Sequence, residues 1–255
     1  MILTKENYFS KAANFEYMGS SQYKSFMSCE EGTLAELKGE WERKETSALL
    51  IGSFVDAHFE NTLDIFKAQH PEMFIKSGAL KAEFQHAEYI IQRIERDQMF
   101  MKYMLGFTQV IQTGIIEGVP FKIKIDSYHP GKCLVDLKIM RDFENQFKPE
   151  QGRLNFIEYW QYDIQAAIYQ EVEFQNSGKR LPFYIAGATK EPEPDIDIFE
   201  IPQYQLDAAL QIVRSNAKHF QNLKEGLYDP QRCEKCNYCK FTKKLTRIKS
   251  MEDLT

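Results

Sequence analysis

The sequence contains no long hydrophobic run, no low-complexity segment and no internal repeat. No stretch approaches the roughly 20 apolar residues that a helix needs to cross a bilayer, although 43% of the 255 residues are hydrophobic. The first residues also lack the basic start, apolar middle and small-residue end of a secretory signal. These absences exclude a membrane-spanning protein and predict a cytoplasmic, globular chain.

The chain also lacks an excess of positive charge. It has 32 Lys and Arg residues against 37 Asp and Glu residues, which gives a net charge of −5. This balance argues against a surface that is basic throughout. It leaves room for a basic channel, because binding follows the local electric field more than the total charge.

Cysteine is scarce, and three of the five cysteines lie together near the C-terminus. Cys233, Cys236 and Cys239 are spaced C-x2-C-x2-C, which in a reducing cytoplasm indicates metal binding before disulfide formation. Three thiolates on a tight loop suit three corners of an iron–sulfur cubane, and Cys29 is the natural fourth ligand. We expect a [4Fe–4S] cluster; zinc, which usually takes two cysteine pairs, and unliganded thiols are the alternatives. Cys133 is expected to be a small core residue.

The C-terminal tail is also basic. One acid, Glu234, accompanies seven basic residues there: Arg232, Lys235, Lys240, Lys243, Lys244, Arg247 and Lys249. A cluster would clasp this tail to the N-terminal helices and hold a patch that contacts DNA phosphates. A disordered, solubilising tail is the alternative.

The period of the hydrophobic pattern changes along the chain and predicts an α/β fold. Apolar residues at helical spacing cover residues 46–70, 78–105, 156–178 and 204–226. Alternating residues and turn signals predict strands over residues 107–116, 119–129, 133–140, 181–190 and 195–201. Residues 141–155 have the polar character of a loop. We predict a single domain in which helices flank a mixed central β-sheet, with a helical N-terminal part (about 1–105), a sheet-bearing core (about 106–226) and the tail (about 227–255).

The hairpin of residues 121–140 carries charges in strands that should be apolar. Side chains alternate along a strand, so Asp136 and Lys138 share one face while Leu137 points the other way. The hairpin turn also brings Asp126 near Asp136. Two carboxylates beside an amine need compensation in a protein interior, and Mg²⁺ provides it because this ion binds one or two carboxylates. A solvated edge strand with an Asp–Lys pair is the alternative.

Two predicted helices carry further polar residues at helical spacing. His58 shares a face with Ile51 and Val55, and Gln165 and Tyr169 stand one turn apart. Each feature alone is ordinary, since such a histidine is usually a packed core residue and such a helix is usually only amphipathic. Their interest lies in their order along the chain, which reads G-x-x-x-D-x-H, I-D, D-L-K and Q-x-x-x-Y.

This order resembles the PD-(D/E)XK nuclease superfamily, and within it the RecB-like phage and prophage exonucleases of the exonuclease VIII (RecE-like) type. The stretches that carry the resemblance are "YMGSSQYKSFMSCE", "GSFVDAHFE", "KIKIDSYHP", "VDLK" and "YWQYDIQAAIYQE". The resemblance implies a restriction-endonuclease-like core. The sequence has Asp136 where many members have Glu, which remains within the family pattern. RecB-like nucleases of the AddB type also combine one early cysteine with three late ones.

The resemblance implies a role for each site residue. The catalytic residues would be Asp126, Asp136, Lys138, Gln165 and Tyr169. The metal ligands would be His58, Asp126, Asp136 and the backbone carbonyl of Leu137. Lys138 would position or activate the attacking water. A histidine ligand suits Mn²⁺ better than Mg²⁺, so we expect both ions to support activity. Glu60 lies two positions from His58 and is therefore expected to face elsewhere on the helix.

The function implied by the resemblance is that of a metal-dependent DNA exonuclease in phage recombination or DNA end processing. A single-strand annealing protein is the expected partner besides DNA, and this branch includes enzymes that form homo-oligomers. The alternatives are a nuclease-inactive DNA-binding module that carries an iron–sulfur cluster, and a related endonuclease.

Overall fold

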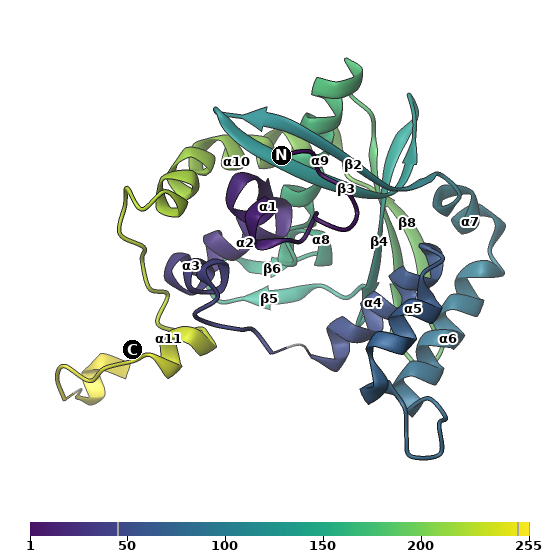
Figure 1. The fold of residues 1–255 in the computed structure, drawn as a ribbon, viewed down its shortest axis with the longest axis horizontal. Coiled ribbons are helices and arrows are strands. Elements are labelled where there is room, and N and C mark those ends of the chain that lie inside the picture. Colours follow the sequence, from purple (N-terminus) through teal and green to yellow (C-terminus); the bar gives the residue numbers. More distant parts are fainter. Residues whose placement is uncertain (45, 249, 255) are drawn as a thin grey trace.

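The computed structural model describes residues 1–44, 46–248 and 250–254, and a mixed β-sheet lies at its centre (Figure 1). Lys249 of the basic tail lies outside these ranges. The strand order is β1-β3-β4-β7-β8, and β2 also pairs with β3. The β1–β3 and β4–β7 pairs are parallel, whereas the other pairs of this sheet are antiparallel. The strands are β1 (Met18–Gly19), β2 (Phe107–Ile116), β3 (Val119–His129), β4 (Cys133–Met140), β7 (Phe183–Thr189) and β8 (Ile196–Glu200).

Helices cover both faces of the sheet, as predicted (Figure 1). Two hydrophobic cores result, one on each face. The first core involves α2 (Ser20–Ser28), α9 (Tyr162–Ser177) and α10 (Gln203–Lys224). The second core involves α4 (Ser47–Phe59), α6 (Ala82–Glu95) and α7 (Gln98–Met104). The shorter helices are α1 (Lys11–Glu16), α3 (Glu30–Lys38), α5 (Leu63–Gln69), α8 (Phe156–Tyr159) and α11 (Asn237–Phe241).

Strand β4 is buried on both faces, and its side chains divide between the two cores. Leu134 and Met140 belong to the first core, whereas Val135 and Leu137 belong to the second. The alternation of a strand dictates this division. It leaves Asp136 on the face of the sheet that α9 covers.

Three predicted long helices are broken, so the expectation of continuous helices was wrong there. The affected ranges are residues 46–70, 78–105 and 156–178. Asn61 and Gln161 have φ values of 58° and 55°, and this left-handed conformation cannot continue a right-handed helix. The side chain of Asp97 accepts a hydrogen bond from the backbone of Phe100 and caps α7, which starts a new helix.

The polar connector of residues 141–155 is not wholly a loop, contrary to the prediction. It contains a small antiparallel hairpin of β5 (Gln146–Lys148) and β6 (Gly152–Leu154). Gly152 has a φ of 77°, a conformation that glycine adopts without strain. A strand pair this short carries too little alternation to be recognised from its sequence.

The C-terminal tail returns to the N-terminal helices, and α11 lies near α3 (Figure 1). The side chain of Arg232 donates to Glu31 of α3 at 2.9 Å, and the rings of Trp41 and Tyr238 have centroids 5.7 Å apart. Within the described ranges, none of the helices combines the length and apolar character that a bilayer-spanning segment needs.

Candidate active site

The predicted acids meet where strand β3 separates from β4. Strand β2 runs along one edge of β3 over residues 119–128. On the other edge, β3 pairs with β1 at Phe121 and Lys122 and with β4 only from Ser127 onward. The edge between these two pairings is open. Asp126 borders this gap, beside the last β3–β4 pair, Ser127 and Val135.

Asp126 and Asp136 line one polar cavity of about 640 Å³ together with Lys138. One oxygen of Asp126 accepts a hydrogen bond from the backbone N–H of Leu137 at 3.0 Å. Asp136 is only 2% exposed and forms an ion pair with Lys138. The structure thus brings together the acids and the amine predicted from the two strands.

Helix α9 supplies the other two predicted residues. The amide of Gln165 donates to Asp136 at 2.7 Å. The hydroxyl of Tyr169 donates to the backbone carbonyl of Lys124 at 3.1 Å. Both residues line the cavity, because the four-residue spacing puts them on the helix face that meets the sheet.

His58 does not line this cavity, so the structure does not bring it together with the other predicted metal ligands, Asp126 and Asp136. Its ring forms a 2.8 Å contact with Glu95 of α6, and its side chain is 32% exposed. Asp56 and Glu60 of the same segment line the cavity instead. Successive helix residues are about 100° apart, so residues two positions from His58 point to nearly the opposite side, and residues four apart share a face.

Glu60 lies two residues from His58 and therefore faces away from it. The side of the helix that faces away from His58 is the side that lines the cavity. The sequence signal was the spacing Gly52, Asp56, Glu60, which repeats every four residues and marks one helix face. The prediction of His58 came from the family resemblance, not from this spacing. Glu60 also lies 3.9 Å from the ammonium of Lys124.

The backbone is distorted opposite Asp126. Gln109 of β2 has a φ of 56°, and the β2–β3 register skips the pair Gln109–Asp126 while continuing on both sides. The amide of Gln109 lies 3.4 Å from the carboxylate of Asp126. Such local departures from ladder geometry re-aim side chains and are typical of functional sites.

The electrostatics of the cavity favour a bound cation. Burial raises the pKa of Asp56 to about 7; Lys138 opposes this rise, and Asp136 and Glu60 add to it. Burial and the charges of Asp136 and Asp56 also raise the pKa of Asp126 well above its usual range. Burial alone would lower the pKa of Lys138, but Asp136 and Asp126 together raise it. The carboxylates thus repel one another, and Lys138 and Lys124 do not fully compensate their burial and repulsion.

These oxygens suit a hard divalent cation. Asp56, Asp126 and Asp136 line the same cavity as Leu137, whose backbone carbonyl was the fourth predicted ligand. Carboxylate and carbonyl oxygens are the donors that Mg²⁺ prefers. With Asp56 in place of His58 the donor set contains no nitrogen, which removes the reason to favour Mn²⁺ over Mg²⁺.

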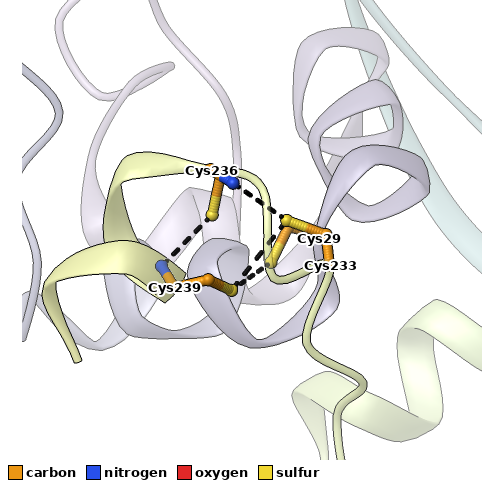
Figure 2. A group of neighbouring side chains, drawn as sticks. All are labelled: Cys29, Cys233, Cys236 and Cys239. Atoms are coloured by element: carbon orange, nitrogen blue, oxygen red, sulfur yellow. Dashed lines mark hydrogen bonds between the residues drawn. The ribbon is translucent and has the colours of Figure 1, made fainter. Parts of the chain in front are cut away.

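The four predicted cysteines form a second centre, shown in Figure 2. The sulfur atoms of Cys29, Cys233, Cys236 and Cys239 all lie within 4.8 Å of one another. Cys29 and Cys239 have sulfurs 3.5 Å apart, and Cys233 and Cys239 have sulfurs 3.9 Å apart. Cys133 lies elsewhere in the second core, as predicted.

Backbone N–H groups stabilise thiolates at this centre. Burial would raise the pKa of Cys233, but the N–H groups of Lys235 and Cys236 point at its sulfur and lower the pKa to about 6. Burial raises the pKa of Cys29 to about 12, so that thiol needs a metal to ionise. Four such sulfurs can bind a metal ion or an iron–sulfur cluster. Around one tetrahedral ion with bonds of about 2.3 Å the sulfurs would lie about 3.8 Å apart.

Comparison with known proteins agrees with the predicted nuclease superfamily. A family model described as "PDDEXK-like domain of unknown function" matches residues 19–242. A crystal structure from Eubacterium rectale, described as a "Putative exonuclease", is 48% identical over 100% of this chain and 98% of that chain, with a TM-score of 0.96. The structure of SSO0001 covers 79% of this chain and 85% of its own at 11% identity, with a TM-score of 0.29. No curated protein sequence matches.

Proposed function

The chain belongs to the family of PDDEXK-like domains, and from this membership we propose that it is a metal-dependent nuclease that hydrolyses DNA from its ends. The observation that carries the proposal is the intact set of Asp126, Asp136 and Lys138 in one polar cavity. Like charges buried together destabilise a fold. A nuclease-inactive DNA-binding module would bear that cost without using it, so the intact set argues against this alternative.

We propose that Asp126, Asp136 and the carbonyl of Leu137 hold a divalent cation, with Asp56 in the role first expected of His58. The raised pKa values of Asp56 and Asp126 support this assignment, because a dication would offset the repulsion between the carboxylates. Mg²⁺ and Mn²⁺ both suit the oxygen donors. Such an ion lowers the pKa of the attacking water and stabilises charge on the leaving oxygen.

The protein's own residues would hold the reacting groups in place. Asp136 and Asp126 raise the pKa of Lys138, whereas a cation bound by the same acids would lower it, so we assign Lys138 to positioning the attacking water or to offsetting charge on the phosphate. Gln165 fixes the orientation of Asp136 through its hydrogen bond. Tyr169 anchors the backbone of Lys124, two residues before Asp126. We assign both α9 residues to positioning.

We further propose that the protein acts as an exonuclease rather than as an endonuclease. This proposal is supported by the description of the Eubacterium rectale protein and by the RecE-like motifs. By the same likeness we propose a cytoplasmic role in phage recombination or DNA end processing, beside a single-strand annealing protein. The chain would act as one domain in each subunit of a homo-oligomer.

For the cysteine centre we propose a [4Fe–4S] cluster, with zinc as the alternative. Three thiolates of the tail and Cys29 supply the four ligands that either centre needs. The present sulfur separations, 3.5 and 3.9 Å for two of the pairs, suit one ion, and a cubane would move the sulfurs apart. Anaerobic purification followed by iron, sulfide and zinc analysis decides between them. A brown protein with iron and sulfide supports the cluster, whereas a colourless protein with one zinc contradicts it.

One assay tests the nuclease and its mode of attack. End-labelled linear duplex DNA and closed circular DNA of the same sequence are incubated with Mg²⁺ or Mn²⁺. We expect loss of the linear DNA only. Asp136→Ala and Lys138→Ala should each slow hydrolysis by about a hundredfold or more, while the matched variant His58→Ala stays close to wild type. Equal activity in Asp136→Ala would remove the assigned site, and cleavage of circles would favour an endonuclease.

A further inference from the structure

A row of lysines and aromatic rings leads away from the active-site cavity at the junction of α8 and α9. The ammonium of Lys138, which lines the cavity, lies 5.4 Å from the ring centroid of Tyr162. The ammonium of Lys24, a residue of α2, lies 5.3 Å from the same centroid. Neither Lys24 nor Tyr162 borders the cavity itself, so the row begins at Lys138 and continues outside.

The row continues through Trp160, Tyr159 and Lys148. The ammonium of Lys24 donates to the backbone carbonyl of Trp160 at 3.4 Å. The rings of Trp160 and Tyr159 meet edge to face, with centroids 4.9 Å apart, and the ammonium of Lys148 lies 5.0 Å from the Tyr159 centroid. Lys148 belongs to β5 of the small hairpin, which packs against α8 (Figure 1). Cations therefore border the aromatic rings at both ends of the row.

Trp160 is the member of the row that faces solvent. It is 53% exposed and forms the C-cap of α8. The next residue, Gln161, has the left-handed φ of 55° that separates α8 from α9. Such strained conformations of residues other than glycine cluster at functional sites. The break leaves a large aromatic ring in water, where it can stack on another flat ring.

The two outer lysines have no acidic partner in the parts of the chain that the structure describes. Burial, and after it the charge of Lys138, lower the pKa of Lys24 to about 8, which nearby carboxylates only partly offset. Lys148 likewise forms no ion pair there. Glu158 and Asp163, the acids of the α8–α9 segment, accept backbone N–H groups. The row therefore suits a ligand that combines negative charge with flat rings.

We propose that Trp160, Tyr159, Lys24 and Lys148 form a platform for unpaired nucleotides of the DNA strand, outside the cavity that holds the acids. One base stacks on Trp160, and the phosphates beside it lie against the lysines. Proteins bind single strands by this combination of positive charge and aromatic side chains. A paired base is already stacked within its duplex, so the platform selects a single strand. The inference rests on the proposed function for the identity of the ligand.

The platform is tested by binding rather than by hydrolysis. Trp41 and Trp160 are the two tryptophans of the chain, so Trp41→Phe leaves Trp160 as the fluorescent reporter. Single-stranded oligonucleotides with one abasic site at each successive position, and the blunt duplex of the same sequence, are titrated in Ca²⁺ in place of Mg²⁺. The anisotropy of fluorescein-labelled copies gives the Kd. The variants are Trp160→Ala and Trp160→Phe, and Tyr204→Ala changes an exposed aromatic residue of α10 as the matched control.

We expect single strands to quench Trp160, and one abasic position to abolish the quenching and weaken binding by about tenfold. That penalty should vanish in Trp160→Ala and persist in Trp160→Phe and in Tyr204→Ala. Lys24→Gln and Lys148→Gln should each reduce the slope of log Kd against log salt concentration by about 0.7, the value for one phosphate contact in a single strand. Lys179→Gln, a change beyond the far end of α9, should leave the slope unchanged.

Three results would overturn the platform: a penalty that persists in Trp160→Ala, no sensitive abasic position, or equal quenching by the blunt duplex. The quenching is measured with the Trp160 ring intact, so the test holds even if Trp160→Ala does not fold. Binding that depends on Trp160 without hydrolysis in Mg²⁺ would keep the platform and refute the nuclease. Hydrolysis without a sensitive abasic position would keep the nuclease and refute the platform.

Discussion

The pH dependence of stability offers a direct test of how burial and neighbouring charges destabilise the carboxylate of Asp56. Burial raises the pKa of this residue from 3.8 to about 7, so the folded protein binds a proton there that the unfolded chain releases. Between these two values the folded state holds more protons, and stability falls as the pH rises. Each pKa unit corresponds to about 1.4 kcal/mol. The free energy of unfolding of the wild type should therefore fall by up to about 4 kcal/mol between pH 4 and pH 8 because of Asp56.

Asp56→Asn removes this loss, because an amide does not titrate. Relative to wild type, the variant should gain up to about 4 kcal/mol in free energy of unfolding between pH 4 and pH 8. Since neighbouring carboxylates share the repulsion, 4 kcal/mol is a ceiling. Urea unfolding followed by circular dichroism at both pH values, in EDTA, measures the difference. Asp64→Asn, a change at an exposed acid of α5, is the matched control.

Mg²⁺ should restore the stability that the wild type loses at pH 8 relative to Asp56→Asn. An ion that binds only the folded state stabilises it in proportion to the logarithm of its concentration over Kd, and the wild type has the fuller set of carboxylates. At pH 8 the added ion should raise the Tm of the wild type more than that of Asp56→Asn. A stability difference that stays flat from pH 4 to pH 8, or equal Tm shifts in both proteins, would refute the reasoning.

Three further predictions concern single residues. Asp97→Ala removes the N-cap of α7 and should cost about 1 kcal/mol in urea unfolding; an unchanged midpoint would mean that the cap is dispensable. Cys236→Ser should lower the bound metal per chain, measured by elemental analysis, whereas Cys133→Ser should leave it unchanged. Gln109→Gly relieves the left-handed φ of 56° but loses the contact with Asp126, so its Tm should stay near that of wild type. Gln109→Val places a β-branched residue, which this conformation disfavours most, and should lower stability by about 1 kcal/mol; equal melting of both variants would argue against strain at this position.

Strand residues were the most predictable part of the site. The two-residue period of a strand forces Asp136 and Lys138 onto one face and Leu137 onto the other. The four-residue spacing of Gln165 and Tyr169 likewise fixed their common face. The mixed sheet flanked by helices followed from the change of period along the chain. These patterns are local consequences of backbone geometry, so they can be read without knowledge of tertiary contacts.

The sequence did not predict the features that depend on tertiary packing. The family resemblance predicts His58 as a metal ligand, whereas the four-residue spacing of Asp56 and Glu60 marks the helix face that reaches the cavity. The left-handed conformations of Asn61 and Gln161 could not be read, since neither residue is a glycine and neighbouring packing selects the conformation.

The cysteine centre has a consequence for the order in which the protein matures. Cys29 is both the C-cap of α2 and the N-cap of α3, and it is separated from Cys239 by 210 residues. During synthesis the ribosome releases Cys29 long before its three partners, so a four-sulfur site cannot assemble until nearly all of this chain has emerged. A metal bound by all four cysteines, as proposed, would therefore enter late in the biogenesis of the protein. Pulse-labelled nascent chains halted before residue 233 should contain no metal held through Cys29.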